Sequence, residues 1–298
     1  MKRIEYTDTE LIITQELEIT AQVILVLTRC KVLFASNTGI TSLGVIMATD
    51  CSFEPLDERS GWKGIADIGK GRSSFNGCYF RGGRGRTLFE FKDQFVSRYF
   101  KEIDDIEITQ NWSEFSLEEQ QSVYHEGTYG GALVSLNASI VNSIFQECRA
   151  TQEGGAVLAT FNVDIEQCQF LRCRAGMDGG AVSVLSNGKI KNCYFESCRA
   201  RDEGGAVILR GFSSIRGVFF KKCIARNGGA IASHAKSFID ECAFLRCIAT
   251  HFGGGINGEI QGSRLLFYKC IANWSGAIHL VECSNITHSK THRCIEKH

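Results

Sequence analysis

The sequence predicts an all-β protein folded as a parallel β-helix, a solenoid in which each turn of the chain stacks on the one before it. Three observations lead to this prediction: a repeat of 22 to 25 residues, short alternating apolar runs inside each repeat, and a single proline among 298 residues. Backbone N–H groups in such a fold donate to neighbouring coils, so proline is disfavoured throughout. We expect about nine or ten coils in one domain spanning residues 1–298.

The repeat is marked by a glycine pair followed by a small residue. Its six clear copies begin at Gly130, Gly154, Gly179, Gly204, Gly228 and Gly253, and a degraded seventh copy is Ser275-Gly276-Ala277. Glycine adopts positive φ without steric cost, so the pair marks a tight bend between short strands.

A second motif, Phe-x-x-Cys-x-Ala, lies at a fixed place in every repeat. Its phenylalanines are Phe145, Phe170, Phe195, Phe220, Phe244 and Phe267. Runs such as Ser143-Ile-Phe145 alternate with the period of two that is typical of strands, whereas helical repeats are longer and need a period of 3.6. Equivalent side chains should therefore stack at the inter-strand spacing of about 4.8 Å.

The pairing of Gly-Gly-Ala with Phe-x-x-Cys-x-Ala resembles the repeats of chlamydial polymorphic outer membrane proteins and of pectin-lyase-like β-helices. The resemblance covers residues 130 to about 280, with weaker echoes at Cys51-Ser-Phe53 and Cys78-Tyr-Phe80. This chain departs from the pattern by placing Cys where Asn usually follows the Phe. The resemblance implies a single-stranded, right-handed β-helix and suggests adhesion or carbohydrate contact.

The repeat is interrupted between Phe80 and Gly130. We expect residues 82–128 to form an insertion on a lateral face. Apolar residues at three- or four-residue spacing from Leu88 to Ile103, and a capping box at Ser116, predict that this insertion is partly helical. Residues 281–298 are expected to form a C-terminal cap or tail.

Nine of the fourteen cysteines fall into two columns between residues 148 and 270. They could form disulfides within a coil, such as Cys168 with Cys173, or act as small apolar side chains in a narrow core. The first column also holds Ser143, Val218 and Leu265, while the second keeps its cysteine in those same coils. An obligatory disulfide would not tolerate loss of its partner, so we predict free, buried thiols. No metal site and no cofactor is predicted.

The variable positions suggest a binding surface. Three coils place an arginine after the cysteine and an acid before the glycine pair: Arg149, Arg174 and Arg199 with Glu153, Asp178 and Glu203. These residues predict either a neutralised stripe of ion pairs or a strip that docks an anion or a partner. In later coils His251, Phe252 and Trp274 occupy consecutive bends, where they would contact a partner, stack on sugar rings or cap the solenoid.

The composition and charge of the chain disfavour several classes of protein. The formal net charge of zero and 44% hydrophobic residues disfavour a disordered chain and a nucleic-acid-binding surface, and no segment is apolar for long enough to span a membrane. No export signal is visible, which predicts a cytoplasmic location, with a secreted or cell-surface location as the alternative if the N-terminus is processed.

The leading expectation is a non-catalytic scaffold whose lateral surface binds a protein partner or assembly. The alternatives are a polysaccharide lyase or glycoside hydrolase, a carbohydrate-binding module, or a surface adhesin. Stacked carboxylates suit an enzyme, but an arginine beside each acid favours neutralisation, so no catalytic residue is assigned.

Overall fold

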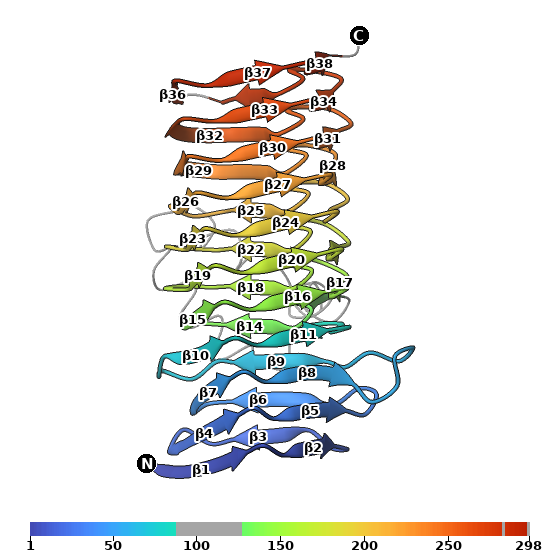
Figure 1. Ribbon diagram of the computed structural model, residues 1–298, viewed down its shortest axis with the longest axis vertical. Coiled ribbons are helices and arrows are strands. Elements are labelled where there is room, and N and C mark those ends of the chain that lie inside the picture. The colour runs from blue at the N-terminus through green and yellow to red at the C-terminus, as the bar shows by residue number, and fades with distance from the viewer. Residues whose placement is uncertain (88–126, 282–283, 297–298) are drawn as a thin grey trace, which may run out of the picture.

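The computed structural model describes residues 1–87, 127–281 and 284–296. These residues form β-strands and no helix, stacked in about eleven parallel coils along one axis (Figure 1). The all-β solenoid is thus confirmed, with slightly more coils than expected, because the N-terminal coils lack the glycine pair that marks the repeat. The helical expectation for the insertion falls mainly on residues 88–126, outside the described chain.

Each complete coil contributes strands to three faces. The first face contains β3 (Leu17–Ile19), β6 (Gly39–Ser42), β9 (Gly64–Asp67), β14 (Leu133–Ser135), β18 (Val157–Ala159), β22 (Val182–Val184), β25 (Val207–Leu209) and β35 (Ile278–Leu280). The second face contains β1 (Lys2–Thr7), β4 (Val23–Thr28), β7 (Val45–Thr49), β10 (Ser73–Asn76), β15 (Ala138–Val141), β19 (Asp164–Glu166), β23 (Lys189–Lys191), β26 (Ser214–Arg216) and β36 (Asn285–Thr287). Two longer strands, β29 (Ile231–Asp240) and β32 (Ile256–Ser263), run through both faces.

The third face is an eleven-stranded parallel sheet. It contains β2 (Glu10–Ile13), β5 (Lys31–Phe34), β8 (Ser52–Pro55), β11 (Tyr79–Arg81), β16 (Ile144–Gln146), β20 (Gln169–Leu171), β24 (Tyr194–Glu196), β27 (Phe219–Lys221), β30 (Ala243–Leu245), β33 (Leu266–Tyr268) and β37 (Lys290–His292). Short strands at the next corner lead back to the first face: β17 (Arg149–Ala150), β21 (Arg174–Ala175), β28 (Ile224–Ala225), β31 (Ile248–Ala249), β34 (Ile271–Ala272) and β38 (Ile295–Glu296).

The core is a set of side-chain columns in strict register. Phe145, Phe170 and Phe195 are directly paired across β16, β20 and β24. From Phe80 to Phe267 the consecutive rings of this column stack nearly parallel, with centroids 4.6 to 5.1 Å apart. The predicted stacking of equivalent side chains is therefore confirmed.

The glycine pair has two separate structural reasons. Gly179 has a φ of 59°, the positive value expected at the bend. Gly180 has no such φ, but a Cβ at this position would overlap the carbonyl oxygen of Gly205 in the next coil. One glycine is therefore needed for the turn and the other for close contact between coils.

The cysteines are free thiols, as predicted, in all thirteen positions that the structure describes. Twelve of them are buried, and Cys294 is partly exposed. The sulfur of Cys198 lies 3.4 Å from the carbonyl oxygen of Phe170 in the preceding coil, and its column repeats this contact. The thiols thus fill the narrow core and cover backbone carbonyls at the corner.

Two irregular segments join this framework. The base of the insertion is closed by an antiparallel pair, β12 (Arg86–Thr87) with β13 (Thr128–Tyr129). Residues 284–296, expected as part of a cap or tail, form β36, β37 and β38, which pair with β32, β33 and β34 as the last coil.

Candidate functional site

The predicted arginine column is present at the corner between the third and first faces. Arg149 of β17 pairs in register with Arg174 of β21, and Arg174 with Arg199. All three side chains point to solvent and are exposed. The corner thus presents three guanidinium groups on successive coils, which we call the arginine strip.

The acids do not neutralise this strip; their ion pairs are made elsewhere. Arg210 Nη2 lies 2.7 Å from Glu153 Oε1 and 2.7 Å from Asp178 Oδ2, and Arg210 Nε donates to Glu153 Oε2 at 3.1 Å. Glu203 is bound by His234. The expectation of a neutralised stripe, with each acid paired to the arginine of its own coil, is therefore corrected.

The reason lies in the direction of the chain at the glycine bend. The acids precede the bend and reach over the outward side of the first face, where Ser183 of β22 donates to Glu153 at 2.8 Å. Arg210 follows β25 directly and extends back over the same side. It meets Glu153 from 57 positions away, two coils further along the chain.

We call the group formed by Glu153, Asp178, Glu203, Arg210 and His234 the acid cluster. Its three acids were predicted from the repeat. Arg210 and His234 were missed because neither belongs to the repeat motif. Their spacing of 24 residues, close to one coil, is the signal that places both in one outward column.

Burial and hydrogen bonding move the acid pKa values in opposite directions. Desolvation raises the pKa of Asp178, with Arg210 opposing it, and the hydrogen bond from His234 lowers the pKa of Glu203. Glu153 and Asp178 share one guanidinium and have side chains only 17% and 13% exposed. Acid or base chemistry here would require releasing a carboxylate from Arg210.

Among residues 1–87, 127–281 and 284–296, no acid neutralises the arginine strip. Within the described chain, Arg149, Arg174 and Arg199 make no ion pair and no side-chain hydrogen bond. Like charges about 4.8 Å apart repel each other even in water. In the part of the chain that the structure describes, the strip is therefore an exposed positive surface.

The same corner becomes apolar in the next coils. Ile224, Ile248 and Ile271 continue the arginine column through β28, β31 and β34. In the adjoining bends Phe252 pairs with Trp274, which is 56% exposed. We call Ile224, Ile248, Ile271, His251, Phe252 and Trp274 the apolar strip.

The predicted aromatic residues are brought together within the apolar strip. The rings of His251 and Phe252 have centroids 6.4 Å apart, and the ring of His279 lies 4.6 Å from Phe252. His279 was not predicted. His279 lies near Phe252 because it belongs to β35, which runs beside the bend that contains Phe252.

These features define a parallel β-solenoid with one lateral corner that is positive at its centre and apolar toward the C-terminal end. No family model, no curated protein and no solved structure matches this chain. Among the described residues, no helix has the length and apolar character needed to cross a lipid bilayer.

Proposed function

We propose that this protein is a non-catalytic β-solenoid that binds a protein partner along the arginine strip and the apolar strip. The observation that supports this proposal is the separation of charges. The nearby acids bind Arg210 and His234, so Arg149, Arg174 and Arg199 are exposed and have no ion-pair partner among the residues that the structure describes. A surface of this kind attracts an acidic group.

The chemistry of the partner follows from the two strips together. Arginine and tryptophan are the residues most often found at the energetic centres of protein interfaces. Trp274 and the isoleucine column supply the apolar contact, and the arginines supply charge complementarity. The expected partner is a protein with an acidic edge beside an apolar patch.

The test is affinity purification from native extract at low salt with three forms of the protein. The triple variant Arg149→Glu, Arg174→Glu, Arg199→Glu should lose a partner that the wild type retains, since each substitution reverses a charge on the strip. The matched control, Lys191→Glu, Lys222→Glu, Arg246→Glu, makes the same net charge change at exposed sites off the strip.

The captured partner should then be purified and its affinity measured against salt concentration. We expect a loss of at least tenfold in the strip variant, about 1.4 kcal/mol or more, and no loss in the control. Equal binding by all three forms, or equal loss in both variants, contradicts the proposal.

A carbohydrate-active enzyme is the second candidate. It is favoured by one observation, the gathering of three carboxylates, an arginine and a histidine over neighbouring coils. The resemblance to pectin-lyase-like repeats belongs with this candidate. Screening polysaccharides for reducing ends and unsaturated products tests it, and activity lost in Glu153→Gln or Asp178→Asn would support it.

A further inference from the structure

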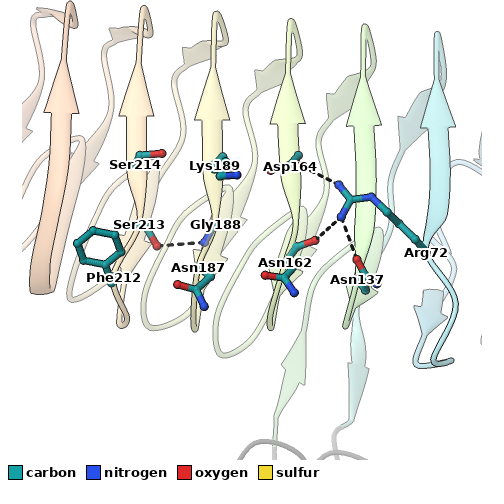
Figure 2. A pocket seen from close by; sticks show the side chains of 10 residues that line it. All are labelled: Arg72, Asn137, Asn162, Asp164, Asn187, Gly188, Lys189, Phe212, Ser213 and Ser214. Atoms are coloured by element: carbon teal, nitrogen blue, oxygen red, sulfur yellow. Dashed lines mark hydrogen bonds and ion pairs between the residues drawn. The ribbon is translucent and has the colours of Figure 1, made fainter. Parts of the chain in front are cut away.

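A polar groove runs across the corner between the first and second faces, away from the arginine strip. Its volume is about 460 Å³, and it spans the bends of several successive coils (Figure 2). Asn137, Asn162, Asn187 and Phe212 occupy equivalent places in four of these bends, 25 residues apart. The groove is therefore a product of coil stacking.

The asparagine amides supply unused hydrogen-bonding capacity. Asn162 and Asn187 are exposed, and their side-chain amides make no hydrogen bond within the described chain. Each amide offers two donors and one acceptor. The middle of the groove thus presents both kinds of group toward solvent at two neighbouring coils.

One end of the groove is held by Arg72. Its guanidinium donates to Asn137 Oδ1 at 3.0 Å, to the Asn162 carbonyl at 3.2 Å and to Asp164 Oδ2 at 2.6 Å (Figure 2). These bonds cross from one coil to later ones, so they fix that wall of the groove. The charge of Arg72 is balanced by Asp164.

The other end carries an aromatic ring and a free cation. Phe212 is 54% exposed, and its ring contacts that of Phe238, with centroids 5.6 Å apart and planes at 85°. Lys189 lies on the neighbouring coil, is exposed and has no ion pair within the described chain. Phe212 thus offers an exposed aromatic ring in the same groove as the positive charge of Lys189.

We propose that this groove binds an oligosaccharide that lies along the solenoid axis. Sugar hydroxyls both donate and accept hydrogen bonds, as the asparagine amides require. The C–H face of a sugar ring packs on an exposed aromatic ring. The spacing of successive coils, about 4.8 Å, is close to the length of one sugar unit in an extended chain.

Lys189 adds a preference for an acidic sugar next to the one stacked on Phe212. A peptide suits the groove less well, because the strands that line it are already hydrogen-bonded to neighbouring coils on both sides. The proposal is independent of the partner surface, which lies at a different corner of the coil.

The test is calorimetric titration with four tetrasaccharides: those of cellulose, mannan and chitin, and one of hyaluronan, which carries carboxylates. We expect saturable binding of at least one of them, strongest for hyaluronan. Phe212→Ala and Asn187→Ala should each weaken it about tenfold. The matched control Phe219→Ala removes a partly exposed ring from another face and should bind as the wild type.

A further variant tests the charge. Lys189→Gln should weaken hyaluronan binding and leave the neutral tetrasaccharides unaffected. Circular dichroism and thermal melting verify that each variant is folded, and Asn187→Ala decides the outcome if Phe212→Ala is unfolded. Absence of binding by all four probes overturns the proposal, as does wild-type affinity in the Phe212 and Asn187 variants.

Discussion

Asp67 is a buried acid whose surroundings make the stability of the folded protein depend on pH. Its side chain is buried between Ser73 and Ser135, whose hydroxyls each donate to it at 2.8 Å. Burial raises its pKa from 3.8 to about 6, since the two hydrogen bonds only partly replace water. Between these two values the folded protein binds more protons than the unfolded chain.

The stability that this carboxyl contributes is therefore complete below pH 4 and lost as the pH rises through 6. The loss amounts to about 3 kcal/mol at most. Asp67→Asn should remove this part of the pH dependence, while Asp57→Asn, at an exposed site, should follow the wild type. Urea unfolding at pH 4, 5, 6 and 7 measures it; parallel curves for wild type and Asp67→Asn would contradict the assignment.

Residue partners were the least predictable feature of this protein. Glu153, Asp178 and Glu203 were recognised from the repeat, but Arg210 and His234 were not, because they carry no motif and reach the acids from later coils. A local pattern indicates which side chains face outward. It does not indicate which of several outward neighbours in other coils completes an ion pair.

At the scale of the strand, the column of stacked phenylalanines is the main packing feature of the core. Phe195 is fully buried and stacks on Phe170 and Phe220, with centroids 4.6 Å and 5.1 Å away. Phe195→Ala should lower the free energy of unfolding by about 3–5 kcal/mol, because it leaves a cavity between two coils. Phe219→Ala, on the outward side of the next coil, removes a ring that is 36% exposed and stacks on Tyr194, so it should cost less, about 1–2 kcal/mol.

Denaturant unfolding of the two variants provides the measurement. Equal destabilisation by the two variants would show that the phenylalanine column is not the main source of stability in these two neighbouring coils. The phenylalanine column itself was predictable, because side chains that recur once per coil lie directly above one another in the stack. The same reasoning identified the buried thiols, since Val218 and Leu265 occupy equivalent apolar positions.

At the scale of the whole molecule, the coils act as repeating units that contact only their neighbours. Deleting Gly180–Gly204 removes 25 residues and joins Gly179 to Gly205, so every remaining column keeps its register. The shortened protein should fold with unchanged circular dichroism per residue. Deleting only Gly180–Lys191 should prevent cooperative unfolding, because strands of different faces would then be brought into register.

Thermal melting and size-exclusion chromatography distinguish these outcomes. If both deletions behave alike, the register of whole coils does not govern stability.

The sequence predicted the type of coil more accurately than the number of coils. The N-terminal strands pair as regularly as the later ones, yet their loops lack the glycine signature from which the repeat was counted.

The sequence by itself determined the stacked coil, the column of phenylalanines and the buried thiols, because each depends on spacing along the chain alone. Only the tertiary structure decided which acids Arg210 binds, that no acid in the described part of the chain pairs with the arginine strip, and that a groove opens beside Phe212. Those features arise where side chains of different coils meet on the outside of the solenoid. There, several partners are within reach, and packing between distant segments selects among them.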